Sequence, residues 1–204
     1  MRAYQSRTLA LAALACCALT GIASSASAQD IEPRAYSNAP VGVNFLIAGY
    51  AYTSGGLSFD SALPVSDPDL STSNAVIAYA RVLDFRGKSA KFDVVAPLSS
   101  LSGSADFDGE PLRREISGLS DPKFRLSVNF FGAPALPLEE FASFQQDLII
   151  GASLQVSAPV GQYDASRLVN LGTNRWSFKP ELGVSKALGR LTLEGAAAVT
   201  LFTD

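Results

Sequence analysis

Apolar residues occur at every second position over several stretches of this 204-residue chain. The clearest stretch covers residues 147–159, where one set of alternating side chains is apolar and the other is mostly small or polar. Alternation with a period of two predicts a β-strand, and about 8 to 12 residues is the length of a tilted strand that crosses a membrane. The apolar set is Leu148, Ile150, Ala152, Leu154 and Val156, and the opposite set is Ile149, Gly151, Ser153, Gln155 and Ser157.

The same pattern recurs along the chain and predicts about seven strands. Short connections at residues 86–88 and 186–189 predict two tight β-hairpins. Over residues 41–53 both faces are apolar, so the facing of that strand stays open. In the run 124–131 we expect Phe131 on the same face as the polar residues. The remaining predicted strands are residues 41–53, 74–85, 88–98, 124–131, 176–185 and 191–202.

Longer connections alternate with the tight ones. Residues 54–73, 99–120 and 159–174 are rich in Gly, Ser, Pro and Asp and are predicted to be loops. Short turns on one side and long loops on the other are the layout of an outer-membrane barrel. Residues 132–146 depart from this layout, and we expect a short helical or loop insertion over residues 135–144 on the side of the tight turns.

The beginning of the chain has the features of a secretory signal peptide. A positively charged start and an apolar run over residues 9–19 precede small residues at positions 26–28. We therefore expect a signal peptide over residues 1–28 and an exported barrel domain over residues 29–204. A lipoprotein modified at Cys17 and a retained anchor helix are the alternatives.

The composition argues against several classes of function. The chain has no histidine, and both cysteines lie within the predicted signal peptide. The exported part then has no disulfide, no thiolate nucleophile and no imidazole ligand, so we expect no enzyme, no catalytic residues, no metal and no cofactor. A net charge of −3 provides no basic surface for nucleic acid. Charged residues make up 17% of the chain, below the roughly 25% usual for soluble domains.

Two further features favour a membrane barrel over a soluble sheet. The apolar faces of the clearest runs carry no charge, as the lipid-facing side of a barrel strand requires, since Lys or Arg there costs roughly 2–4 kcal/mol. Gly151, Gly183 and Gly195 weaken a soluble strand because they offer little to pack, whereas a barrel wall accommodates them. The predicted fold class is therefore an all-β, antiparallel transmembrane β-barrel in the outer membrane, with lipid as its expected partner.

Several separate motifs resemble one family of outer-membrane proteins. They are the stretches 118–129, 132–136, 157–164, 167–176 and 178–181, and together they cover most of residues 35–204. They resemble the family named for the putative MetA-pathway of phenol degradation. The resemblance implies a transporter-like barrel linked to the degradation of aromatic compounds. The resemblance also implies a larger barrel, of about 12 strands. The seven strands predicted here are an odd number, which does not close a bacterial barrel. We therefore expect this chain to be a fragment.

Candidate functional residues fall into two groups. The first consists of charged side chains expected to line a lumen, and the second of loop residues expected along a solute path. In the loops, Asp121 is also predicted to accept hydrogen bonds from backbone donors, and Gly161 to adopt a positive φ. The lumen candidates are Lys179, Glu181, Glu194 and Arg125, and the loop candidates are Arg167, Asn170, Asn174 and Arg175.

The leading hypothesis is a passive channel for a small, apolar or aromatic solute. Opposed charges across the lumen would tune its selectivity, although the same charges are equally expected in a neutralised network that plugs it. The alternatives are a structural or surface-interaction barrel without transport, and a soluble periplasmic binding module of the lipocalin type. The oligomeric state stays open.

Overall fold

The structure is a computed structural model, and it describes residues 35–56, 65–107, 110–167 and 169–204. These residues belong to one compact unit, Arg34–Asp204. The predicted signal peptide lies outside the described residues. Among the described residues, no helix has the length and apolar character needed to cross a membrane.

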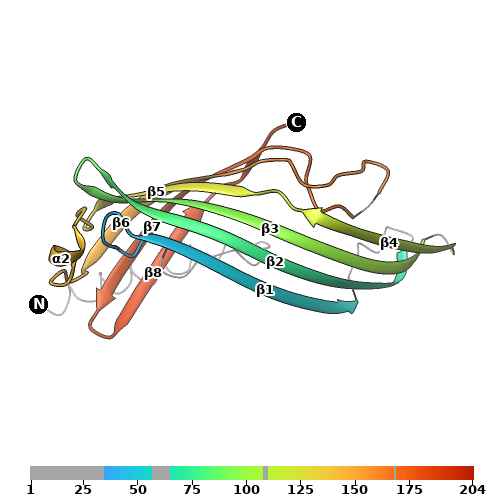
Figure 1. Cartoon of the computed structure of the whole chain (residues 1–204), viewed down its shortest axis with the longest axis horizontal. Coiled ribbons are helices and arrows are strands. Elements are labelled where there is room, and N and C mark those ends of the chain that lie inside the picture. The colour runs from blue at the N-terminus through green and yellow to red at the C-terminus, as the bar shows by residue number, and fades with distance from the viewer. Residues whose placement is uncertain (1–34, 57–64, 108–109, 168) are drawn as a thin grey trace, which may run out of the picture. The chain divides into compact units, whose positions relative to one another are not determined.

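The unit is one antiparallel sheet whose strands follow one another in chain order (Figure 1). Neighbouring strands are antiparallel, and the sheet is strongly curved. The strands are β1 (Asn44–Gly56), β2 (Val65–Phe85), β3 (Lys88–Phe107), β4 (Glu110–Leu119), β5 (Lys123–Phe131), β6 (Leu148–Ser157), β7 (Ser177–Leu188), β8 (Leu191–Ala198) and β9 (Leu201–Phe202).

At two places across the sheet, two separate strands pair with different parts of the same neighbouring strand. Both β4 and β5 pair with β3, the first along its second half and the second along its first half. Pro122 lies in the gap between them, where its missing N–H interrupts the ladder. In the same way, β8 and β9 both pair with β7. The order of the sheet is therefore β1-β2-β3-β5-β6-β7-β8, and the predicted count of about seven strands is confirmed.

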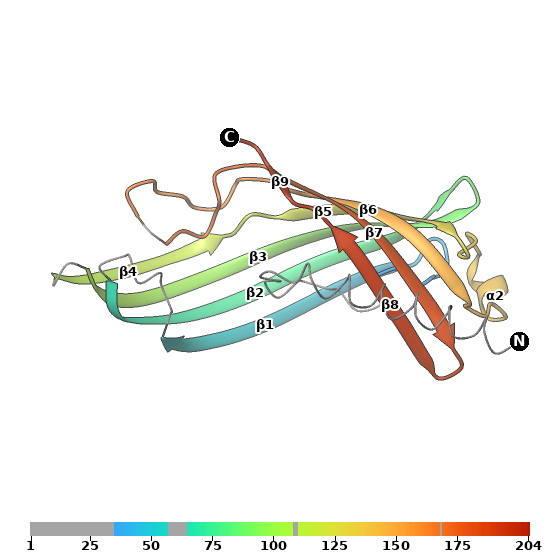
Figure 2. The same ribbon diagram turned by 180° about the vertical axis from the view of Figure 1, so that it is seen from behind.

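The tight turns lie at one end of the sheet, as expected. Arg86 and Gly87 both have positive φ in the β2–β3 turn, and Gly189 does in the β7–β8 turn. The short helix α2 (Leu138–Phe141) is at the same end, where Ala135 N donates to Gly87 O at 3.1 Å. Figure 2 shows α2 and the β7–β8 turn at this end from behind. The insertion predicted over residues 135–144 thus contains a helix beside the tight turns.

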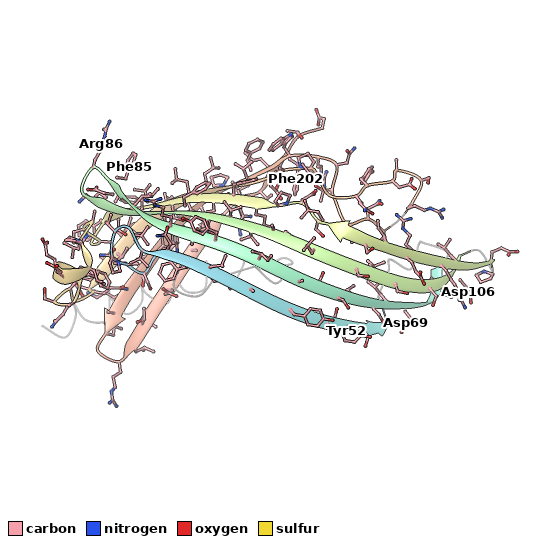
Figure 3. The ribbon with its side chains drawn as sticks, viewed as in Figure 1. Tyr52, Asp69, Phe85, Arg86, Asp106 and Phe202 are labelled. Carbon is pink, nitrogen blue, oxygen red and sulfur yellow. The ribbon has the colours of Figure 1, made fainter. Side chains whose placement is uncertain are left out.

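The prediction of loops over residues 54–73 and 99–120 was wrong for most of their length. Strand β1 pairs with β2 as far as Gly56↔Asp69, and β3 pairs with β4 as far as Phe107↔Glu110. These arms lie at the opposite end from Phe85 and Arg86 in Figure 3. One face of the β3–β4 arm is polar, with Ser100 and Ser102, and the other mixes apolar residues such as Leu101 with Gly103 and Arg114. The apolar alternation by which a strand is predicted is therefore weak, yet a backbone ladder needs none.

The outer face of the sheet carries a continuous apolar band. Residues opposite one another in an antiparallel ladder share a face, so the register identifies each row of side chains. One such row of opposite residues runs across all seven strand positions of the sheet. Its residues are apolar except for one tyrosine, and each of them is half-buried or exposed. That row is Leu46, Tyr79, Val94, Phe124, Val156, Phe178 and Leu201.

A β-bulge changes the facing predicted for one aromatic residue. The β5–β6 register shifts between Asn129 and Phe131, so that Phe131 lies opposite Ile150 on the outer face. The expectation that Phe131 joins the polar face was therefore wrong. An extra residue in one strand moves every later side chain to the other face, and no feature of the alternation announces it.

Candidate functional site

The opposite, inner face of the sheet carries the polar side chains predicted for a lumen. Asp93 on β3 lies directly across from Arg125 on β5, and Arg125 Nε donates to Asp93 Oδ2 at 3.0 Å. Both side chains are largely buried, with 15% of Arg125 and 11% of Asp93 exposed. At this depth a charge needs its partner, since an unpaired charge away from water is costly.

A second charged group lies on β7 and β8. Lys179 Nζ is 3.8 Å from Glu181 Oε2, because residues two apart in a strand share a face. Glu194 accepts a hydrogen bond of 3.2 Å from Ser185 Oγ, its cross-strand partner. The structure thus places all four lumen candidates on the inner face. Arg125 on β5 lies opposite Gln155 on β6, which lies opposite Lys179 on β7, so the three residues form one row across the sheet.

A segment that the sequence analysis did not single out lies against this inner face. Residues 35–43 precede β1, and their main-chain bonds reach several strands; we call them the strap. Lys91 Nζ donates to Ala35 O at 3.3 Å, and Asn129 Nδ2 donates to Tyr36 O at 3.1 Å. At its far end, Gly42 N donates to Val82 O at 3.0 Å. The bonds from Lys91 on β3 and Asn129 on β5 place the beginning of the strap against the inner face.

Tyr36 anchors the strap. Its side chain is only 5% exposed, and its hydroxyl donates to Glu181 Oε1 at 2.8 Å. The ring occupies space left by two glycines that face each other across β6 and β7. A Cβ on Gly183 would be 1.9 Å from Tyr36 Cε2, and a Cβ on Gly151 would be 2.4 Å from Tyr36 Cδ1.

Burial also affects the ionisation of this anchor. Desolvation, reinforced by the adjacent Glu181 carboxylate, raises the pKa of Tyr36, which precedes the first strand, to about 12. The phenol therefore stays protonated at neutral pH and remains a hydrogen-bond donor. In the sequence, Glu181 was predicted to line the lumen, and the two glycines were interpreted as a general property of a barrel wall.

Beside the end of β6 that is farther from the tight turns, Asp121 fastens the loop that follows β6. Its Oδ1 accepts from Gly161 N at 2.9 Å, and its Oδ2 accepts from Thr173 N at 2.7 Å and Thr173 Oγ1 at 2.8 Å. The predicted role of Asp121 as a backbone acceptor is confirmed. Gly161, however, is not among the residues with positive φ. Glycine is needed there because a Cβ would be 2.8 Å from Gly172 Cα.

The four loop candidates belong to two separate local arrangements. Asn170 Nδ2 donates to Asp164 O and Arg167 O at 3.0 and 3.1 Å, which closes a small turn. Arg167 is 3.9 Å from Asp164, whose pKa is lowered by hydrogen bonds from Ser166. Elsewhere, Asn174 has a φ of 54°, and the Arg175 guanidinium lies 4.2 Å from the centre of the Phe202 ring. These contacts all lie within the loop or beside its end.

Comparisons with known proteins agree with this architecture. One similar solved structure is an outer membrane channel from Pseudomonas putida F1, with a TM-score of 0.60 and 19% sequence identity. The match covers 86% of this chain and 61% of that structure, so this chain spans less than two thirds of its length. No match is found among curated proteins. A family model described as "Putative MetA-pathway of phenol degradation" matches residues 46–204, most of the chain, and the protein belongs to that family.

Proposed function

We propose that this chain forms the wall of an outer-membrane channel that passes small, apolar or aromatic solutes. The observation that carries this proposal is the division of one curved sheet into an apolar outer face and a charged inner face. In lipid, every backbone polar group must form a hydrogen bond within the protein. An antiparallel sheet with an apolar outer face meets this requirement once its edge strands pair and close a barrel.

The outer face is too apolar and too exposed for contact with water. Leu182 is 62% exposed, Leu154 is 46% exposed and Leu126 is 46% exposed, although all three lie in the middle of strands. Soluble monomers rarely expose a continuous apolar surface larger than a few hundred Å². Here the band continues across all strand positions, which is the arrangement expected of a surface that contacts lipid.

The inner face supplies the groups that would select a solute. Arg125 and Lys179 are positive, Asp93 and Glu181 are negative, and their pairing along one band would create a transverse field across the lumen. We propose Lys179, Glu181, Glu194 and Arg125 as lumen-lining residues, and Arg167, Asn170, Asn174 and Arg175 as residues of the loop at one mouth.

Two comparisons support the site of action and the class of solute. The similar structure is titled an outer membrane channel, and the family description names phenol degradation. A channel needs no reactive group, and the paired charges of the inner face supply binding rather than chemistry.

The test is uptake by liposomes that contain the complete gene product. Phenol and a charged molecule of similar size would be compared with empty liposomes. We expect phenol uptake to rise several-fold and to change when Arg125→Met is introduced, because that change leaves Asp93 without its ion pair. Recovery of the protein from the soluble periplasmic fraction would refute the proposal, and stable membrane insertion without uptake would establish a structural barrel instead.

A further inference from the structure

The notch between β6 and β7 has the features of a binding site for a phenol. Its floor is formed by Gly151 and Gly183, whose missing side chains leave room for one flat ring. Glycine in a strand interior weakens the strand, and two of them directly opposite each other double that cost. Such a pair is explained by the ring that lies on it.

The notch also has a polar end that matches a phenolic hydroxyl. Glu181 Oε1 accepts the Tyr36 hydroxyl at 2.8 Å, and Lys179 lies 3.8 Å from the other carboxylate oxygen. The Glu181 side chain is 16% exposed, so its interaction with a hydroxyl donor is only weakly screened. The notch therefore recognises a flat ring and a hydroxyl group together, which is the chemistry of 4-methylphenol, the side chain of tyrosine.

The ring that occupies the notch belongs to a segment outside the sheet. Tyr36 precedes β1, and its backbone lies outside the described strands. The strap is held near it by Lys91 and Asn129, which bond to main-chain oxygens of the strap. The Tyr36 side chain can therefore leave the notch without breaking a strand-to-strand hydrogen bond.

We propose that this notch is a phenol-binding subsite, which Tyr36 fills as an internal ligand until a phenolic solute displaces it. The proposal rests on the proposed function, since the solute must reach the inner face. It adds a defined site at Gly151 and Gly183, an acceptor for the solute hydroxyl in Glu181, and an internal competitor in Tyr36.

The first experiment empties the notch in the complete gene product. Tyr36→Ala is titrated by calorimetry in detergent with 4-methylphenol and, separately, with toluene, which lacks only the hydroxyl. We expect 4-methylphenol to bind about 10- to 100-fold more tightly than toluene, because a hydrogen bond to a charged acceptor contributes that much. In Tyr36→Ala/Gly183→Ala this binding should be lost, whereas Tyr36→Ala/Gly195→Ala should keep it, since a Cβ at Gly195 meets only Val184 Cγ1 at 3.8 Å.

The second experiment uses the protein with its tyrosine in place and decides the matter if Tyr36→Ala fails to fold. Ser37 is half-buried beside the anchor, and Ser37→Cys allows an environment-sensitive fluorophore to be attached. We expect 4-methylphenol to shift the emission as the Tyr36 ring leaves the notch, and toluene to leave it unchanged. Equal binding of 4-methylphenol and toluene, no binding by folded Tyr36→Ala, or an unresponsive fluorophore would overturn the proposal.

The two proposals fail separately. Phenol uptake by liposomes without binding at the notch would leave the channel intact and remove the subsite. Binding at the notch without uptake would remove the channel and leave a closed barrel that binds phenols.

Discussion

Gly183→Ala should destabilise this protein far more than a single added methyl group normally does. The new Cβ would be 1.9 Å from Tyr36 Cε2 and 2.4 Å from Tyr36 Cδ2. The Tyr36 ring is rigid, and its backbone belongs to the strap. A flexible side-chain end could move aside at little cost, but a rigid ring on a notch floor has to leave. The hydroxyl then loses Glu181, and the ring loses its burial.

The size of the effect follows from these two losses. A hydrogen bond to a charged acceptor contributes about 1.5–3 kcal/mol, and burial of an aromatic side chain contributes a similar amount, so the free energy of unfolding should fall by about 3–6 kcal/mol. Gly195→Ala is the matched control on the neighbouring strand, where the nearest atom to the new Cβ is 3.8 Å away. It should be neutral or stabilise the strand by up to about 1 kcal/mol.

The assay is unfolding by urea in lipid vesicles, followed by fluorescence of Trp176, the only tryptophan of the chain. A double-mutant cycle with Tyr36→Ala isolates the cause. Without the ring, Gly183→Ala should cost less than about 1 kcal/mol, so that most of the penalty disappears. Equal costs for Gly183→Ala and Gly195→Ala, or a Gly183→Ala cost that survives the loss of Tyr36, would refute the account of the notch.

Three other perturbations test the remaining features. Leu154→Lys should lower stability in lipid by about 2–4 kcal/mol and reduce insertion into vesicles. Gln155→Glu places a charge one residue along but on the inner face, between Arg125 and Lys179, and should be tolerated; similar insertion of the two variants would contradict the assignment of faces. Asp121→Ala removes the acceptor of three hydrogen bonds and should speed protease cleavage within the following loop, measured by mass spectrometry, while Asp164→Ala, in the exposed part of that loop, should not change the attachment. Asp93→Leu should cost about 3 kcal/mol by urea unfolding, and Asp93→Leu/Arg125→Met should recover most of it, because the penalty comes from removing the Asp93 carboxylate from beside the largely buried Arg125 guanidinium.

The regular part of the sheet could be predicted because it alternates. In β6 and β7 the apolar and polar sets fall on the faces that the sequence indicates, and the ladder runs without interruption from Leu148↔Lys186 to Ser157↔Ser177. Alternation is visible wherever the two faces meet different surroundings. The hairpin arms, which include residues 65–73 and 99–107, have polar residues on both faces. Their pairing therefore produces no clear apolar alternation in the sequence.

The candidate site was only half visible for a related reason. Charges such as Lys179 and Glu181 stand out against an apolar strand, and their inner position follows from the period of two. Tyr36 does not stand out, because it lies in an irregular segment 145 residues before Glu181, which accepts its hydroxyl. Long-range contacts of that kind are not encoded in local periodicity. The bulge at Phe131 escaped prediction because one inserted residue changes the facing without changing the composition.

The two glycines show how a local defect in a strand becomes intelligible once the tertiary contact is known. Gly151 and Gly183 together weaken the β6–β7 pair by about 1–2 kcal/mol relative to alanine. The Tyr36 ring offsets this with about 3–6 kcal/mol of burial and hydrogen bonding, so the pair is favourable only while the notch is filled. An empty notch would leave a weak point in the wall and an acidic acceptor without its donor. A wall built in this way requires an occupant, and the chain supplies a phenol of its own at the position where a phenolic solute would meet the same two glycines and the same carboxylate.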